Sequence, residues 1–259
     1  MNILALGDVF GEGGLSAVER NLRELKKACA ADLTVINGEN AAVLGITSRQ
    51  AARLFDAGAD VVTLGNHAFH RRDITKALSD NPYLIRPLNF SGELPGGGYA
   101  DVYSPSGLKV RVVNLIGRCF MNDSSSDNAF RAIDRLLARN DADMYAVDFH
   151  AEATSEKLAL AYYLDGRVSV LFGTHTHVPT ADARILPNGM GYVTDLGMCG
   201  PIESVLGIRP EQSIGSYMGA LPEKYEAAGG ACKLDGAVFT VDEKTGRCTA
   251  VKRIDGEKI

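Results

Sequence analysis

The chain begins with a regular alternation of apolar runs and amphipathic stretches. Runs of β-branched and aliphatic residues are typical of buried strands, whereas apolar residues spaced three and four apart are typical of helices. The alternation therefore predicts parallel β-α-β units with right-handed crossovers. The Gly-rich segments 11–14 and 96–98 are predicted loops, and neither resembles a P-loop because no Lys-Ser or Lys-Thr follows. The predicted strands are residues 3–6, 33–36 and 61–64, and the predicted helices are residues 17–28 and 48–56.

The pattern changes in the middle of the chain, where two apolar runs are separated only by turn residues. Residues 99–103 and 108–115 flank a Ser-Pro-Ser-Gly turn at 104–107 and predict a hairpin. Near the end of the chain, residues 237–241 and 249–254 predict a second hairpin. Hairpins are antiparallel, so the sheets are expected to be mixed.

A helix and a further strand-helix-strand unit are predicted between the two hairpins. Ser and Asp residues in the polar stretch 122–128 offer N-cap side chains for a helix at 129–137. Two core strands are predicted at 144–149 and 168–172, with a helix at 155–163 between them in the sequence. No internal repeat or long linker interrupts the chain. We therefore expect one α/β domain, residues 1–259, with two mixed sheets packed together and helices outside.

Composition and charge narrow the class of protein. A chain of 259 residues with 46% hydrophobic content is long enough for a sizeable core. Its 27 basic residues against 32 acidic ones give a net charge of -5, which argues against stable binding of duplex nucleic acid. Small anionic ligands remain compatible with this balance, because bound metal ions can supply a local positive field.

The compartment is indicated by what the sequence lacks. The start, MNILALGDVFGEGG, has no basic segment or cleavage site of a signal peptide, and no apolar stretch approaches the roughly 20 residues that span a bilayer. The cysteines are odd in number and widely spaced, so neither a disulfide framework nor a zinc ribbon is indicated. We expect a cytoplasmic protein without membrane association and with reduced thiols at Cys29, Cys119, Cys199, Cys232 and Cys248.

Polar clusters follow five of the apolar runs. In α/β sheets, functional sites form just beyond the carboxyl ends of strands. Any one cluster could be an ordinary turn, since Asp, Asn and Gly are common turn residues. Five such clusters, which contain four of the five histidines, are better explained by one metal centre. The clusters are Asp8, Glu39-Asn40, Asn66-His67, His150 and His175-Thr176-His177.

The residue types in these clusters select the metal and its chemistry. Carboxylate, amide and imidazole groups suit manganese, iron or zinc rather than a thiolate-bound structural ion. His175 and His177 are two residues apart, so both imidazoles face one side of an extended segment, although a pair of hydrogen-bonded surface histidines would look the same. A carboxylate that bridges two ions about 3.5–4 Å apart would favour hydrolysis of phosphoesters.

Several longer motifs carry a family resemblance. The order Asp, Gly-Glu-Asn, Gly-Asn-His, His and Thr-His-Thr-His resembles the calcineurin-like metallophosphoesterases, which are two-sheet α/β sandwiches. NGENAA at 37–42, DFHAEATSEK at 148–157, GTHTHVPTAD at 173–182 and RILPNGMGYVTDLGM at 184–198 are similar to the bacterial YmdB family. That resemblance spans nearly the whole chain and implies hydrolysis of 2′,3′-cyclic nucleotides and other phosphodiesters.

The resemblance also implies a role for each cluster. One ion would be held by Asp8, Glu39 and His177, with Asn40 close to it. The other ion would be held by Glu39, Asn66, His150 and His175, so that Glu39 is the bridge. Glu39 stands where most metallophosphoesterases have Asp, and Phe10 stands where they have His; both departures match the YmdB pattern. Fewer imidazoles at the first ion favour iron or manganese, with zinc as an alternative.

His67 would be the general acid that protonates the leaving ribose oxygen, since imidazoles titrate near neutral pH. The alternative is a further metal ligand or a helix cap. Family members often carry an acidic residue three positions later, where this chain has His70. Asp73 is a candidate, on charge alone, for the group that orients His67.

Three functions fit this ligand set. The leading one is a dinuclear phosphodiesterase acting on small nucleotide phosphoesters, above all 2′,3′-cyclic nucleotides. A phosphomonoesterase or nucleotidase would use the same two ions, and a metal-bound sensor of phosphorylated ligands would turn over slowly. The intact ligand set with His67 favours an enzyme. Relatives of the resembled family suggest a homo-oligomer.

Overall fold

Two six-stranded sheets pack face to face in the computed structural model, which describes residues 1–121, 126–221, 223–254 and 256. The first sheet has the order β15-β14-β1-β3-β4-β5. Its central strands are parallel, and β14 pairs antiparallel with both β1 and β15. The strands are β1 (Asn2–Leu6), β3 (Leu33–Asn37), β4 (Val61–Thr63), β5 (Leu84–Ile85), β14 (Gly236–Asp242) and β15 (Arg247–Ile254).

The second sheet has the order β10-β11-β9-β8-β7-β6, and its middle strands are also parallel. The predicted hairpin closes one edge, because β6 pairs antiparallel with β7. A short strand, β10, pairs antiparallel with β11 at the other edge. The strands are β6 (Tyr99–Tyr103), β7 (Lys109–Ile116), β8 (Met144–His150), β9 (Val170–Thr174), β10 (Arg184–Ile185) and β11 (Gly191–Val193).

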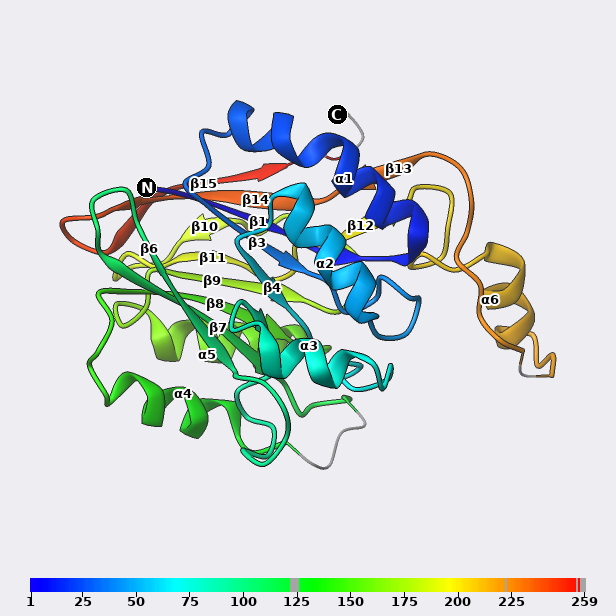
Figure 1. The fold of residues 1–259 in the computed structure, drawn as a ribbon, viewed down its shortest axis with the longest axis horizontal. Coiled ribbons are helices and arrows are strands. Elements are labelled where there is room, and N and C mark those ends of the chain that lie inside the picture. Colours follow the sequence, from blue (N-terminus) through cyan, green and yellow to red (C-terminus); the bar gives the residue numbers. More distant parts are fainter. Residues whose placement is uncertain (122–125, 222, 255, 257–259) are drawn as a thin grey trace.

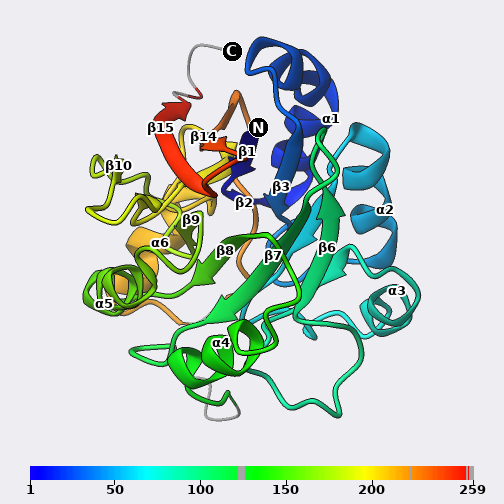
Figure 2. The same ribbon diagram turned by 90° about the vertical axis from the view of Figure 1, so that its left-hand side faces the viewer.

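Helices cover the outer face of each sheet (Figures 1 and 2). The first sheet carries α1 (Gly11–Ala28), α2 (Ser48–Ala57) and α3 (Ile74–Asp80), and the second carries α4 (Ala129–Leu137) and α5 (Thr154–Leu164). The predicted N-caps of α4 are Ser and Asp residues of the polar stretch, of which residues 122–125 lie outside the described residues. The cap is instead Asn128, whose side chain accepts from the Arg131 amide. The predicted sandwich of two mixed sheets between helices is therefore confirmed.

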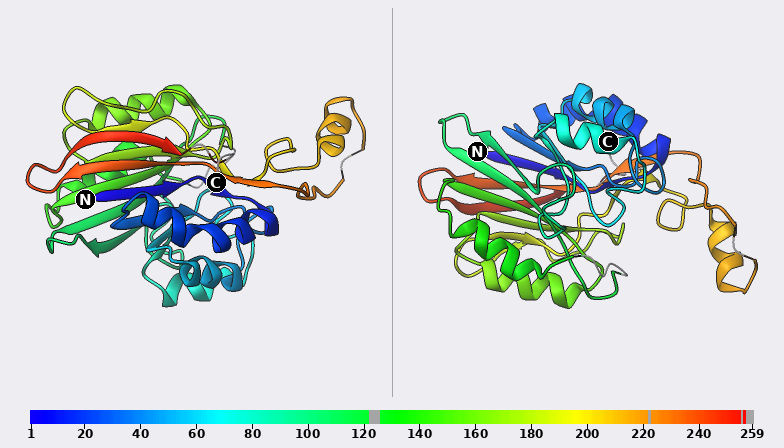
Figure 3. Two further views of the ribbon diagram at one scale, coloured as in Figure 1. Left: turned by 90° about the horizontal axis from the view of Figure 1, so that it is seen from above. Right: turned by 60° about the horizontal axis from the view of Figure 1, so that its bottom comes forward.

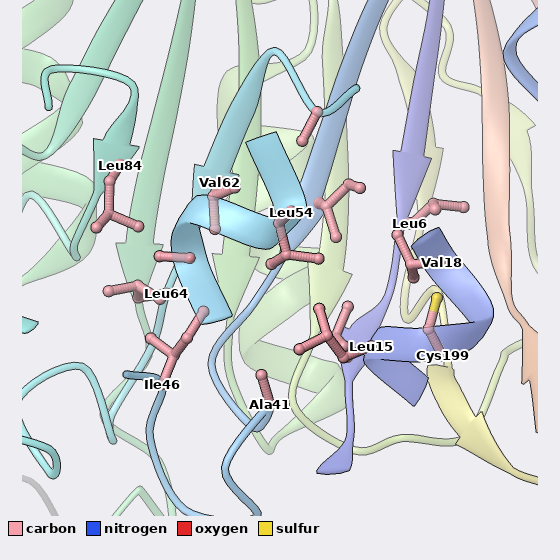
Figure 4. Close-up of a cluster of buried hydrophobic side chains, with 14 of the residues drawn as sticks. Leu6, Leu15, Val18, Ala41, Ile46, Leu54, Val62, Leu64, Leu84 and Cys199 are labelled. Atoms are coloured by element: carbon pink, nitrogen blue, oxygen red, sulfur yellow. The ribbon is translucent and has the colours of Figure 1, made fainter. Parts of the chain in front are cut away.

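Side-chain alternation along the strands separates the core into layers. On β1, Ile3 and Ala5 point between the sheets, whereas Leu4 and Leu6 pack against the helices of the first sheet. Figure 4 shows this outer layer, in which Leu15 of α1 and Leu54 of α2 lie among strand residues. Strands buried on both faces read as continuous apolar runs, which is why the sequence displays them clearly.

The prediction of a loop at residues 11–14 is wrong, because α1 already begins at Gly11. The amide of Gly14 donates to the Phe10 carbonyl at 3.2 Å, as in a first helical turn. A Cβ atom at Gly14 would lie 2.0 Å from the backbone oxygen of Cys199. The glycine is therefore explained by close packing of the helix against a strand, whereas residues 96–98 form a loop as predicted.

A third, three-stranded sheet was not predicted. It has the order β13-β12-β2 and joins β2 (Asp8–Val9), β12 (Met198–Pro201) and β13 (Cys232–Leu234). Beyond it, the segment that we call the arm, residues 202–221 and 223–231, projects from the body and carries α6 (Pro210–Tyr217) (Figure 3). No helix in the described part of the chain is long and apolar enough to cross a membrane.

Candidate metal centre

The seven predicted ligands converge at one edge of the sandwich. Asp8 lies on β2, and His150 is the last residue of β8. The others follow the ends of β3, β4 and β9 within three residues. Because the carboxyl ends of parallel strands meet at one edge, segments from both sheets contribute to one cluster. The ligands are Asp8, Glu39, Asn40, Asn66, His150, His175 and His177.

Asp8, Asn40 and His177 form one part of the cluster. The Nε2 atom of His177 lies 3.7 Å from Oδ1 of Asp8 and 3.1 Å from Nδ2 of Asn40. Its Nδ1 faces the backbone oxygen of Leu206 at 2.9 Å, which fixes the ring orientation. Phe10, where the sequence departs from the broader superfamily, packs edge-on against the His177 ring at 5.5 Å.

The second part of the cluster is centred on His150, which contacts Asn66, His175 and Glu39. Its Nε2 lies 3.0 Å from Oδ1 of Asn66, 3.1 Å from Nδ1 of His175 and 3.4 Å from Oε1 of Glu39. Its Nδ1 lies 3.8 Å from Oδ1 of Asp8, which links the two parts. Each predicted ligand is thus within 4 Å of another, although they come from segments far apart in the sequence.

The chemistry of these donors fits metal ions. Oδ1 of Asp8 and Oε2 of Glu39 are fully buried, and neither has a hydrogen-bond partner among the described residues. Such an oxygen costs about 1–3 kcal/mol, and more when charged, unless a partner or a cation satisfies it. No three His, Cys, Asp or Glu side chains in the described ranges already surround one point as ligands around an ion do. The match to metal ions therefore lies in the donor types and in the two buried oxygens, not in a preformed coordination sphere.

Charges within the cluster shift the pKa values strongly. Burial raises the pKa of Asp8. Burial also acts against ionisation of Glu39, but the adjacent His150 and His67 outweigh it and hold the pKa of Glu39 below its usual range. The carboxylates in turn outweigh burial at His150 and raise its pKa to about 9, whereas burial and the charge of His150 lower the pKa of His175 to about 3. The carboxylates thus favour a positively charged partner here, and a metal ion is such a partner.

His67 contacts the central carboxylate directly. Its Nδ1 lies 3.0 Å from Oε1 of Glu39, and its backbone amide donates to the same oxygen at 3.0 Å. Among the described residues the carboxylate in contact with His67 is that of Glu39, whereas the carboxylate of the candidate Asp73 accepts from the Ser48 amide at 2.8 Å. The His70 ring lies edge-on at 5.9 Å.

A buried network that the sequence analysis did not predict holds His150 from behind. Nδ1 of His150 lies 2.9 Å from the hydroxyl of Thr174, which donates to Asp148 at 2.7 Å. Asp148 also accepts from Thr63 at 2.5 Å and from Asn37 at 3.1 Å, and burial raises its pKa to about 6. Asp148 precedes His150 by two positions, so the strand period could have indicated this pair.

A second unpredicted pair supports the loop that carries both ligand histidines. Lys157 of α5 and Asp195 are fully buried and 2.7 Å apart. Lys157 also donates to the carbonyl of Thr174 at 2.9 Å, and Asp195 accepts from the Thr176 amide at 3.1 Å. The pair therefore holds both neighbours of His175, whose φ of 103° is rare outside glycine. The sequence predicted no role for either Lys157 or Asp195.

The cluster opens into a cavity of about 310 Å³. His67, His175, His177 and Asn40 form part of its wall. Pockets for small ligands typically measure about 300–1,000 Å³, so the cavity is at the small end of that range. The arrangement can bind a compact anionic ligand against metal ions, with the imidazole of His67 beside it.

The whole chain is similar to several known proteins. Residues 4–254 match the sequence model described as "YmdB-like protein". The chain is 42% identical over 257 residues to the "2′,3′-cyclic-nucleotide 2′-phosphodiesterase" of Bacillus subtilis, covering 98% of this chain and 96% of the relative. It is 38% identical to a "putative phosphatase/phosphodiesterase" of Mycoplasma pneumoniae, covering 95% and 89%.

Two crystal structures share the whole fold. A hypothetical protein from Thermus thermophilus superposes with a TM-score of 0.91 at 40% identity, covering 98% of both chains. A novel phosphatase from Mycoplasma pneumoniae superposes with a TM-score of 0.92 at 36% identity, covering 98% of this chain and 92% of that one. With the family match over nearly the full length, these likenesses show that the chain belongs to the YmdB-like family.

Proposed function

We propose that this protein is a metal-dependent phosphodiesterase that hydrolyses small nucleotide phosphoesters, in particular 2′,3′-cyclic nucleotides. The observation that carries the proposal is a pair of buried oxygens, on Asp8 and Glu39, that have no hydrogen-bond partner among the described residues. They lie beside four histidines, three of which line a small cavity. The activity named for the Bacillus subtilis relative supports the same substrate class. Carboxylate and imidazole groups at a cavity of this size suit a phosphoryl group bound to metal.

We assign two ions to the cluster, with iron or manganese favoured over zinc. When bound, such ions neutralise charge on the phosphoryl group and lower the pKa of an attacking water. Glu39 would hold both ions, as the family resemblance implies; its Oε1 lies 3.4 Å from Nε2 of His150. The first ion is assigned to Asp8, Glu39 and His177 with Asn40 close by, and the second to Glu39, Asn66, His150 and His175.

We assign the role of general acid to His67. Its side chain is 30% exposed and lines the cavity, whereas the histidines of the cluster are more buried. The contact between its Nδ1 and Glu39 orients the ring. An imidazole held in this way can deliver a proton to the leaving ribose oxygen, a role that typically contributes about 10²–10⁴-fold to the rate.

The test is hydrolysis of 2′,3′-cyclic AMP by protein loaded with manganese or iron, with the products resolved by the position of the phosphate. Glu39→Gln should abolish turnover and reduce bound metal. His67→Ala should retain metal and lose about 10²–10⁴-fold in kcat, and wild-type activity in this variant would remove the assignment. Preferential hydrolysis of nucleoside monophosphates would instead indicate a nucleotidase, and two bound ions without turnover would indicate a sensor.

We further propose that residues 1–259 act as a single catalytic domain, because both large sheets and the small sheet contribute ligands to one cluster. Association of copies is also proposed. The tip of the arm carries Tyr217, Met218 and Leu221, which are 92%, 82% and 90% exposed. Exposed apolar groups of this size favour burial against a partner. Light scattering of wild-type protein and of Met218→Asp tests this: a monomer in both would contradict it.

A further inference from the structure

The cavity at the metal centre has two chemically different sides. One side is polar: the proposed function assigns roles to Asn40, His67, His175 and His177, and Glu152 and Thr176 complete this side. The other side is apolar and has no role in the proposed reaction. It consists of Phe10, Val43, Leu44, Leu206, Ile208 and Tyr225, which we call the apolar wall.

Three segments that are distant in the sequence build the apolar wall. Phe10 precedes α1, and Leu44 belongs to the loop after β3. Leu206 and Tyr225 come from the outgoing and returning halves of the arm (Figure 1). An isolated bridge between Ile208 and Ala227 joins these two halves near the body.

The arm is fixed to the metal centre at this point. The carbonyl of Leu206 faces Nδ1 of His177 at 2.9 Å, and Phe10 packs on the same imidazole. A predicted metal ligand therefore positions the wall directly. The wall nevertheless keeps accessible surface, since Leu44, Leu206 and Tyr225 are 37%, 46% and 40% exposed.

We propose that the apolar wall is the subsite for the nucleobase of the substrate. The inference rests on the proposed function, because a phosphate held by the ligands places the rest of the nucleotide within the same 310 Å³ cavity. A base is flat and weakly polar on its faces, so it gains by covering aliphatic and aromatic side chains. A cavity of this volume is suited to one nucleotide rather than to a polynucleotide chain.

The phenol ring of Tyr225 is the aromatic group of the wall that is most available for stacking, because Phe10 already packs on His177. Stacking of a base on an aromatic ring tolerates any base, since every base has a π face. We therefore expect hydrolysis of purine and pyrimidine 2′,3′-cyclic nucleotides alike.

The experiment compares two substrates in wild-type protein and in Tyr225→Ala. The substrates are 2′,3′-cyclic AMP and methyl riboside 2′,3′-cyclic phosphate, which lacks the base. In Tyr225→Ala, kcat/KM for cyclic AMP should fall by about 5- to 150-fold, the range expected for loss of one stacking contact. The value for the base-free substrate should stay within about twofold of wild type.

Tyr103→Ala is the matched control, because Tyr103 is a tyrosine that is 68% exposed and does not line the cavity. This control should have the wild-type kcat/KM for both substrates. If Tyr225→Ala prefers cyclic AMP over the base-free substrate as strongly as wild type does, the wall is not the subsite for the base. If Tyr225→Ala changes only the oligomeric state, the wall is a contact between copies and the proposal is likewise overturned.

Binding separates failure of the subsite from failure of the proposed function. If wild-type protein hydrolyses neither substrate, the proposed function fails, and calorimetry then tests the wall alone. Metal-loaded wild-type protein should bind adenosine 3′-monophosphate at least about fivefold more tightly than Tyr225→Ala does, and both should bind ribose 3-phosphate equally. Equal binding of the adenosine nucleotide by the two proteins overturns the subsite.

Discussion

Replacement of Lys157 by Met should destabilise the protein more than loss of any exposed ion pair. Lys157 and Asp195 are fully buried at 2.7 Å, and removal of the ammonium group leaves the carboxylate of Asp195 without its charged partner. Breaking a buried pair in this way typically costs about 3–5 kcal/mol. Asp195 keeps hydrogen bonds from the amides of Thr176 and Gly197, at 3.1 and 2.9 Å, so we expect a loss of about 3 kcal/mol.

Lys26→Met is the matched control, since Lys26 pairs with Asp60 at 3.1 Å while both side chains are partly exposed, at 24% and 38%. Solvent screens such a pair, so its loss should cost about 0–1 kcal/mol. Urea unfolding followed by circular dichroism measures both variants, and equal slopes against urea would show that the exposed surface on unfolding is unchanged.

Partial rescue by a second substitution is also expected. In Lys157→Met/Asp195→Asn the buried negative charge is absent, and the amide oxygen can still accept one backbone hydrogen bond. The double variant should therefore be more stable than Lys157→Met. A Lys157→Met protein that loses no more stability than Lys26→Met, or a double variant that is less stable than the single one, would refute the electrostatic explanation.

Two further predictions concern the metal site and the contact between Glu243 and the N-terminal ammonium. In Gly65→Ala, the new Cβ would lie 1.9 Å from Oε2 of Glu39 and 2.3 Å from Cδ2 of His150, so the carboxylate of Glu39 must move. The variant keeps every proposed ligand, but it should lose most of its bound metal, as measured by atomic emission. Gly92→Ala, with no atom within 4 Å of its Cβ, should keep wild-type metal content, and equal content in both variants would contradict the prediction. Hydrogen bonds from two serine hydroxyls and the N-terminal ammonium lower the pKa of Glu243 to about 2 from its usual value of 4.5. Because its folded pKa is depressed, Glu243 contributes stability that is complete above about pH 4.5 and is lost as the pH falls toward 2. Glu243→Gln should thus be less stable than wild type near neutral pH in thermal unfolding, with a difference that shrinks as the pH falls below 4.5; a difference independent of pH would exclude this linkage.

The sequence by itself determined most strands of the two large sheets, most helices and the positions along the chain of the residues that we propose as ligands. Strands buried on both faces are continuous apolar runs, and polar residues at their ends are conspicuous for that reason. The order of Asp8, Glu39 and His150 along the chain is therefore legible from the residues alone. A motif at the end of a strand is recognised from the order of apolar and polar residues over a short stretch of chain, and this order can be read directly from the sequence.

Only the tertiary structure decided which distant groups meet. His67 contacts Glu39 rather than Asp73, because the turn after β4 lies against the loop after β3. Lys157 meets Asp195 across 38 positions of the chain, and the arm brings Tyr225 to the cavity of the metal centre. Neither a lone buried Lys nor a tyrosine in a polar segment carries a periodic signal. Their partners are set by the packing of helices and loops on the sheets, and this packing depends on the whole fold.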